Sequence, residues 1–191
     1  MSLFKICLIG AESTGKSTLA QDLAKALRSG GYWAQATPEA LRLFCDRHQR
    51  LPLAADEPII FEAQQLAELV FESQDSAAKF LVCDSSPLLT AFTSHWYFGD
   101  ESLLREGLQH QLSYLHCYLS EPSLPWEADG IHRDGPQVRT RFHNDLKRFL
   151  DEHQIPHEAV TIKPDVVSKS SAQATVMADQ LLAKAGWPPQ R

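Results

Sequence analysis

The chain has 191 residues, of which 43% are hydrophobic and 22% charged, and its formal net charge is −6 at pH 7. This length suits one domain with its own hydrophobic core, so we expect residues 1–191 to form a single domain. The negative charge argues against non-specific binding to nucleic acid or to a membrane surface, because no basic excess exists to meet phosphate groups. No apolar run approaches the ~20 residues that cross a bilayer.

Two further features favour a cytoplasmic protein. The first predicted strand, at residues 4–9, starts almost directly after the N-terminus and leaves no room for a signal peptide. The four cysteines lie far apart and lack the paired C-x-x-C spacing of metal or disulfide sites. We interpret them as small buried hydrophobic residues in a reducing compartment.

A phosphate-binding motif follows the first strand. Residues 10–17 read Gly-Ala-Glu-Ser-Thr-Gly-Lys-Ser and fit G-x-x-x-x-G-K-[ST], and residues 18–27 have helical spacing. In this motif the glycines let backbone N–H groups turn toward a phosphate, while Lys16 meets the β- and γ-phosphates and the Ser17 hydroxyl binds Mg²⁺. The start of the helix adds positive charge. The residues predicted to bind the nucleotide are Gly10, Glu12, Ser13, Thr14, Gly15, Lys16, Ser17 and Thr18.

The remaining chain alternates strands and helices. After the stop signal Ser29-Gly30-Gly31, strands are expected at residues 32–36, 80–83, 114–119 and 158–162. A helix with Thr37 as its N-cap and Pro38 in its first position should follow the second strand. Further helices are expected at residues 58–78, 85–96, 101–112, 137–153 and 171–185. The first of these has an apolar stripe made of Ile59, Ile60, Ala63, Leu66, Ala67 and Val70.

This pattern predicts the fold class. Apolar strands separated by helices indicate a parallel sheet covered on both faces. We therefore predict an α/β protein, a P-loop NTPase-type three-layer sandwich with a five-stranded parallel sheet. Ligands of such sheets bind beyond the carboxyl ends of the strands. That edge should carry the loop at residues 10–17, Glu39, Asp84 and the segment 121–136.

Asp84 directly follows the apolar strand at residues 80–83. In phosphoryl-transfer sites a carboxylate at this position holds Mg²⁺ or accepts a proton. The alternative is an exposed aspartate that caps the next helix. The phosphate loop upstream favours the catalytic and metal-binding interpretation.

Three arginines lie in or just after the irregular segment 121–136, namely Arg133, Arg139 and Arg141. Guanidinium groups suit the negative charge that develops on a transferring phosphoryl group, and small kinases often supply them from a closing lid. We predict a lid at about residues 121–141, with Arg133 and Arg139 catalytic and Arg141 at the nucleotide. For each arginine alone, the alternative is a solvated surface charge.

The acceptor side of the site is less distinct. Glu39 and Arg42 are three residues apart on one helix, and they either face the second substrate or form a surface ion pair. Trp126 is suited to stack on a flat ring, although aromatic residues more often belong to a core. The pattern alone makes Gln64 a surface residue of the long helix.

Together these segments resemble the ribosylnicotinamide kinase domain of the bifunctional NAD-biosynthesis and regulator proteins. The matching motifs cover nearly the whole chain: residues 10–18, Glu39 with Arg42, Gln64, residues 83–85 with Thr90, and the lid sequence Leu-Pro-Trp-Glu-Ala-Asp-Gly at 124–130. The resemblance implies phosphorylation of the 5′-hydroxyl of nicotinamide riboside with ATP and Mg²⁺, and it places Trp126 and Asp129 among the substrate residues.

The chain departs from this family near the acceptor. Ser86 stands in place of a second acid, Ala128 in place of the first lid aspartate, and the arginine after the lid glycine is displaced to Arg133. Three functions therefore stay open: a kinase for nicotinamide riboside, a kinase for another nucleoside or small metabolite, and an ATP-binding regulatory module without an acceptor. In a kinase, Glu39 or Asp84 would be the base.

Overall fold

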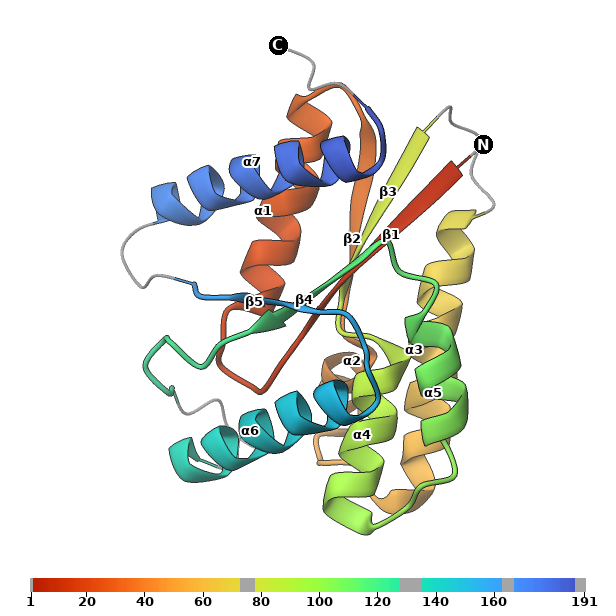
Figure 1. Cartoon of the computed structure of the whole chain (residues 1–191). Coiled ribbons are helices and arrows are strands. Elements are labelled where there is room, and N and C mark those ends of the chain that lie inside the picture. Colours follow the sequence, from red (N-terminus) through yellow and green to blue (C-terminus); the bar gives the residue numbers. More distant parts are fainter. Residues whose placement is uncertain (1, 73–77, 128–134, 163–166, 188–191) are drawn as a thin grey trace.

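The computed structural model describes residues 2–72, 78–127, 135–162 and 167–187 (Figure 1). One or more helices separate each strand from the next along the described chain, which confirms the predicted pattern. The elements are β1 (Ser2–Ile9), α1 (Lys16–Ser29), β2 (Trp33–Thr37), α2 (Ala40–His48), the short 3₁₀ helix η1 (Ala54–Asp56), α3 (Glu57–Glu72), β3 (Ala78–Asp84), α4 (Pro87–Phe98), α5 (Leu104–Gln111), β4 (His116–Ser120), α6 (Pro136–Glu152), β5 (Glu158–Val160) and α7 (Val167–Lys184).

The five strands form one parallel sheet in the order β2-β3-β1-β4-β5, which confirms the predicted fold class. The central strand β1 pairs Leu8 with Asp84 of β3 and Ile9 with Leu119 of β4. Because the strands are parallel and in this register, the carboxyl ends of β1, β3 and β4 meet at one edge. The phosphate loop starts from that edge.

Helices cover both faces of the sheet, with α1 and α7 on one side and α4 and α6 on the other (Figure 1). Alternate residues of β1 enter the two cores: Ile6 and Leu8 pack toward α1 and α7, Cys7 and Ile9 toward α4 and α6. A strand segment buried on both faces favours apolar residues at successive positions, which explains the apolar run at residues 6–9. The four cysteines are free and buried, as predicted.

The long helix α3 differs from the prediction in extent and orientation. It ends at Glu72, and Ala78 and Lys79 belong to β3 instead of the helix. The predicted apolar stripe largely faces solvent, since Ile59, Leu66 and Val70 are 62%, 59% and 61% exposed. The inward face carries Ile60 and Phe61 together with three polar residues, Glu57, Gln64 and Glu68, each 1% exposed.

The first residues of α2 and α4 can be compared with the helix starts predicted from the sequence. Thr37 is not the N-cap of α2, because its pairing with Cys83 continues β2 through that position, and the N-cap is Glu39. By contrast, α4 starts within two residues of the predicted position: its first residue is Pro87, and Ser86 is the N-cap, whose Oγ accepts a hydrogen bond from the Leu89 N–H.

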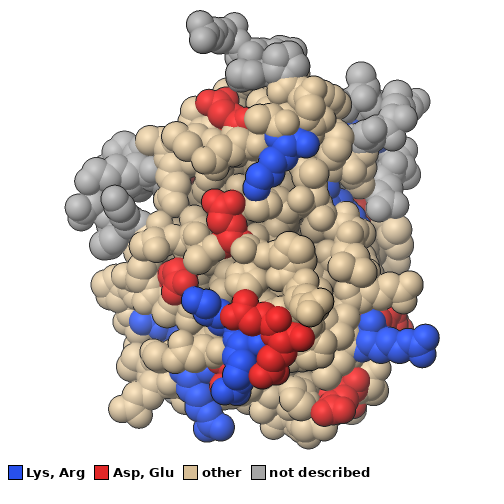
Figure 2. Space-filling model, viewed as in Figure 1, with Lys and Arg blue, Asp and Glu red and all other residues tan. Residues whose placement is uncertain are grey.

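Charged side chains of both signs are interspersed on the face shown in Figure 2. Along α6, Arg141 and Arg148 pair with Asp145, and Arg148 also approaches Glu152. In the part of the chain that the structure describes, no helix combines the length and apolar character needed to cross a membrane.

Glu68 is the centre of a buried polar cluster that joins α3 to β1 and α5. Its carboxylate accepts hydrogen bonds from Lys5 Nζ at 3.1 Å and from Tyr114 Oη, and His110 Nε2 lies 2.9 Å away. Burial by itself raises the pKa of Glu68, but the hydrogen bonds from His110 and Tyr114 and the charges of His110 and Lys5 outweigh it and lower that pKa. The polar face of α3 is therefore turned inward because it meets polar groups.

We expect Glu68→Gln to lower the free energy of unfolding by about 3 kcal/mol at pH 7, since it leaves the buried Lys5 charge uncompensated. The pKa of Glu68 is lower in the folded than in the unfolded chain, where the ordinary value is 4.5. The carboxylate therefore stabilises the fold above that value and ceases to do so as the pH falls through the lowered folded pKa.

Urea unfolding of both proteins at several pH values between 7 and 3 measures this effect. The difference between wild type and variant should be full at neutral pH and shrink in acid. Glu62→Gln, an exposed change on the same helix, is the control. An equal loss of stability in both variants, or a difference that does not change with pH, would contradict the role of Glu68.

Candidate nucleotide and acceptor site

The phosphate loop between β1 and α1 has a backbone that requires glycine. Gly10 and Gly15 have φ values of +145° and +83°, which side-chain-bearing residues rarely adopt. A Cβ atom on Gly10 would lie 2.8 Å from the carbonyl oxygen of Ser120, and one on Gly15 would lie 3.0 Å from Leu124 Cδ1. Gly10 therefore lacks both the space and the conformation for another residue, whereas at Gly15 the conformation is the main constraint and the contact is with a flexible side chain.

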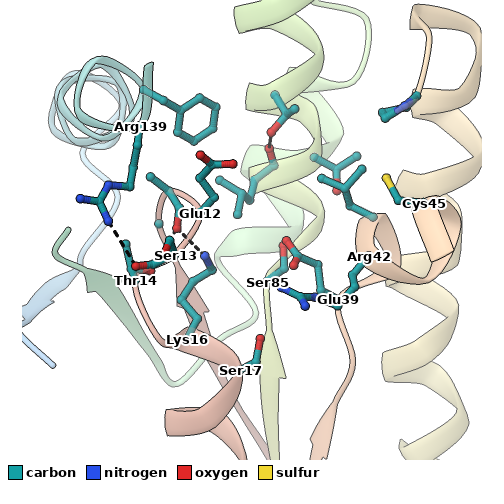
Figure 3. Close-up of a pocket in the computed structure, with 18 of the residues that line it drawn as sticks. Glu12, Ser13, Thr14, Lys16, Ser17, Glu39, Arg42, Cys45, Ser85 and Arg139 are labelled. Atoms are coloured by element: carbon teal, nitrogen blue, oxygen red, sulfur yellow. Dashed lines mark hydrogen bonds between the residues drawn. The ribbon is translucent and has the colours of Figure 1, made fainter. Parts of the chain in front are cut away.

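Hydrogen bonds within the loop hold its shape. Thr14 Oγ1 donates to the carbonyl oxygen of Ala11 at 3.0 Å, and Ser120 Oγ donates to the Thr14 carbonyl oxygen at 3.4 Å. Lys16 is the first residue of α1, and its Nζ donates to the same Ala11 carbonyl at 2.7 Å, so the ammonium group lies over the loop (Figure 3). This arrangement places a cation and the positive end of α1 beside one concave backbone.

Residues 121–127, the part of the predicted lid that precedes its undescribed residues, contact the phosphate loop. Trp126 Nε1 donates to Glu12 Oε1 at 2.9 Å, and the Glu127 N–H donates to Ser13 Oγ at 3.4 Å. The indole therefore joins the lid segment to the loop through a polar contact. Arg133 and Asp129, the other predicted lid residues, lie outside the described residues.

Of the two predicted arginines on α6, only Arg139 reaches the loop. Its Nη1 donates to the carbonyl oxygens of Ser13 at 3.3 Å and Leu124 at 3.0 Å, while its buried Nε has no partner among the described residues. Arg141 does not line the cavity: it is 78% exposed, pairs with Asp145 and lies over the Trp96 ring. Two residues along a helix correspond to a rotation of about 200°, so the side chains point in opposite directions.

Two carboxylates approach the loop from neighbouring strands. Glu39 follows β2, and Asp84 ends β3. Burial raises the pKa of Glu39, the Asp84 charge raises it further, and the cations of Lys16 and Arg42 oppose this shift. Asp84 is buried, and its Oδ1 has no hydrogen-bond partner in the described chain. Asp84 is therefore not the exposed helix cap of the alternative interpretation; Ser86 is the cap.

Gln64 of α3 binds the backbone of α2 at Ala40, the residue next to Glu39. Its Oε1 accepts a hydrogen bond from the Ala40 N–H at 2.9 Å, which satisfies one of the free donors at the start of α2. The interpretation of Gln64 as a surface residue is wrong, because α3 turns this position toward α2 and buries it. Figure 3 shows Glu39 and Arg42 together on this side of the cavity, beside Ser85.

The residues present fit a magnesium ion. Ser17 lines the cavity, and the unpaired Oδ1 of Asp84 is an oxygen ligand without a protein partner in the described chain. Mg²⁺ in nucleotide sites takes one or two protein oxygens and completes its shell with water and phosphate oxygens. Ser17 and Asp84 would hold it at the edge of the sheet.

One cavity of about 580 Å³ is lined at one end by the phosphate loop and continues past Glu39 and Arg42. We call the part lined by the residues named below the acceptor half, after the candidate second substrate. Sequence reasoning missed several residues of the acceptor half. They are Leu41, Cys45, Leu51, Pro52, Glu57, Leu89, Thr93, Tyr97, Phe98, Val138 and Phe142. For Glu57 a signal was available, because it lies in phase with Ile60, Phe61 and Gln64, three and four residues apart along the face that α3 buries.

The loop between β1 and α1, on a five-stranded parallel sheet with helices on both faces, defines a P-loop nucleotide-binding fold. A model of the AAA domain family matches residues 5–168. The chain belongs to this family.

Solved structures share the fold. A NadR protein in complex with NR matches 98% of this chain with a TM-score of 0.65 and 16% identity, and a NadR protein in complex with NAD and AMP-PNP matches 98% with a TM-score of 0.61 and 16% identity. A thymidylate kinase from Ehrlichia chaffeensis matches 95% of this chain and 100% of its own length, with a TM-score of 0.61 and 13% identity. The chain spans about half of the NadR chains, 53% and 51%. No curated protein matches it in sequence. The motif resemblance is thus confirmed as a likeness in fold.

We expect Gly10→Ala to abolish nucleotide binding and to lower the melting temperature, because the new Cβ would collide with the Ser120 carbonyl at 2.8 Å. Gly99→Ala is the matched control: Gly99 also has a positive φ, of +69°, but beyond its chain neighbours no described atom lies within 4 Å of the place its Cβ would take. That control should lose only about 1 kcal/mol from backbone strain and should keep nucleotide affinity. Calorimetric titration with a non-hydrolysable ATP analogue measures binding, and equal affinity in both variants would contradict the steric argument.

Proposed function

We propose that the protein is an ATP-dependent kinase that phosphorylates the 5′-hydroxyl of nicotinamide riboside to give nicotinamide mononucleotide. The observation that carries the proposal is the single cavity that runs from the phosphate loop to an acceptor half with carboxylates and apolar walls. A nucleotide held on the loop and an acceptor in the other half would meet between Lys16 and Glu39.

The choice of acceptor is supported by two findings. The lid sequence at residues 124–130 resembles that of ribosylnicotinamide kinases, and a NadR protein that shares this fold was solved in complex with NR. The small hydroxylated acceptor is also consistent with the size of the cavity, about 580 Å³ for the nucleotide end and acceptor together.

Each part of the site has a proposed task. The loop N–H groups and Lys16 bind the β- and γ-phosphates, and Arg139 offers its free Nε to the transferring group, with Arg133 of the lid as a second cation. Mg²⁺, when bound at Ser17 and Asp84, neutralises charge on the phosphate oxygens. Trp126 holds the segment 121–127 to Glu12. The resemblance to ribosylnicotinamide kinases assigns Asp129 to the acceptor.

In the transfer step, the acceptor hydroxyl oxygen bonds to the γ-phosphorus while the bond to the bridging oxygen breaks and ADP leaves. The hydroxyl proton passes to a carboxylate, Glu39 or Asp84. A pKa raised above its ordinary value makes the Glu39 carboxylate a stronger base, whereas the unpaired Oδ1 of Asp84 suits metal binding.

Lys16→Ala should reduce phosphorylation by about 100-fold or more, because it removes a charge aimed at the phosphates, and should leave the folded structure intact. Circular dichroism checks the fold. The control is Lys25→Ala, an exposed change on the same helix. ADP release is measured with nicotinamide riboside, with a panel of nucleosides and with no acceptor.

The same assay separates the alternatives. Release that requires nicotinamide riboside supports the proposal. Release that requires another acceptor, or that needs no acceptor, would contradict it in favour of a different kinase or a regulatory ATPase. Unchanged turnover in Lys16→Ala would overturn the mechanism itself.

A comparison of Glu39→Gln with Asp84→Asn identifies the base. If Glu39 is the base, kcat/KM of the wild type rises with pH through its raised pKa, and Glu39→Gln removes this limb and lowers kcat by about 100-fold or more. Asp84→Asn should then chiefly raise the Mg²⁺ concentration needed for activity. The opposite pattern would assign the base to Asp84, and full activity of both variants would exclude proton transfer to either carboxylate.

A further inference from the structure

The acceptor half of the cavity exposes apolar side chains from two separate elements. Leu51, in the connector after α2, is 46% exposed, and Tyr97 and Phe98 at the end of α4 are 47% and 41% exposed. Large apolar groups gathered around a cavity are typical of sites that receive a flat apolar body. This half of the cavity is therefore suited to a ring.

Beside these residues, Glu57 places a carboxylate with one unpaired oxygen in the cavity wall. It is the first residue of α3 and is 1% exposed, and its Oε1 has no hydrogen-bond partner within the described ranges of the chain. A buried carboxylate without a partner destabilises a fold. In contrast to Glu68 on the same helix, which three side chains contact, Glu57 contributes no visible structural bond through that oxygen.

The charges around Glu57 leave this half of the cavity negative. Asp56 precedes it and pairs with Arg50 at 2.6 Å. The Cys45 thiol of α2 lines the cavity too, and burial together with nearby carboxylates raises its pKa. Glu39 lies in the field of two cations, Lys16 and Arg42. The charge that acts on Glu57 is that of Asp56, so Glu57 is the carboxylate of this half for which the described chain provides no cation.

We propose that Glu57 is a specificity-determining residue whose carboxylate binds a planar, positively charged ring of the acceptor against the apolar wall. This inference rests on the proposed function and adds the charge that the acceptor must carry. A planar cation satisfies both features, because its faces contact Tyr97 and Phe98 while its charge replaces the missing partner of Glu57. An acceptor with a carboxylate or phosphate near its ring would be repelled.

The test compares nicotinamide riboside with its reduced form, which has the same ribose and amide but an uncharged ring. Affinities are measured by calorimetry without ATP at pH 8. Wild type should bind the cationic riboside more tightly than the reduced one. Glu57→Gln, which keeps the shape of the side chain, should weaken binding of the cation by about 30-fold and change binding of the reduced form little. Glu62→Gln, exposed on the same helix, should match wild type.

Two readouts separate this role from a structural one. Burial and the neighbouring Asp56 raise the pKa of Glu57 to about 7. Because the ionised form binds the cation, affinity should rise from pH 6 to pH 8 in wild type and stay level in Glu57→Gln. The melting temperature of Glu57→Gln should equal or exceed that of wild type, whereas loss of a structural contact would lower it.

The outcomes distinguish the two proposals. If wild type binds and phosphorylates nicotinamide riboside but Glu57→Gln keeps the preference for the cation, the Glu57 proposal is wrong and the proposed function stands. If the cation binds through Glu57 but is not phosphorylated, the proposed function fails and the Glu57 proposal stands. If wild type binds neither riboside, both fail.

Discussion

The close approach of Gly10 to Ser120 is the constraint on which the site depends. The ends of β1 and β4 lie so near each other that no Cβ fits between them, with 2.8 Å left to the Ser120 carbonyl. This contact directs the chain into the phosphate loop, where Ser120 Oγ also holds the Thr14 carbonyl. Asp84 reaches the same edge because the parallel register pairs it with Leu8 of β1. The geometry of the nucleotide end therefore follows from strand pairing in the core.

The buried polar face of α3 has a structural part, formed by Glu68 and Gln64, and a part at the cavity, formed by Glu57. Glu68 ties the helix to β1 and α5 through paired charges, and Gln64 fixes the start of α2 through one backbone hydrogen bond. Glu57, one end of the same face, has an oxygen without a partner in the described chain and lies at the cavity. A rigidly anchored helix can hold such a carboxylate in place although its burial destabilises the fold, a common property of binding sites.

The phosphate loop is linked by hydrogen bonds to the segment 121–127 and to α6. Arg139 holds the carbonyls of Ser13 and Leu124, and Trp126 reaches Glu12. These bonds make the loop, the described lid residues and α6 one polar assembly around the cavity. Because Ser13 and Leu124 share the Arg139 guanidinium, the position of the segment 121–127 and the shape of the phosphate loop are physically coupled.

The sequence by itself determined the class of fold, the phosphate loop and the chemical role expected of Asp84, because apolar runs and a short motif act through local backbone geometry. It also pointed to Glu39 and Arg139, which the structure brings to one cavity. It misjudged the face of α3, the burial of Gln64 and the direction of Arg141, and it missed Glu57. Periodicity reports which residues share a helix face, but the neighbours that a face meets are set by tertiary packing. For α3 those neighbours are polar, so only the folded structure decided which side chains the acceptor half would contain.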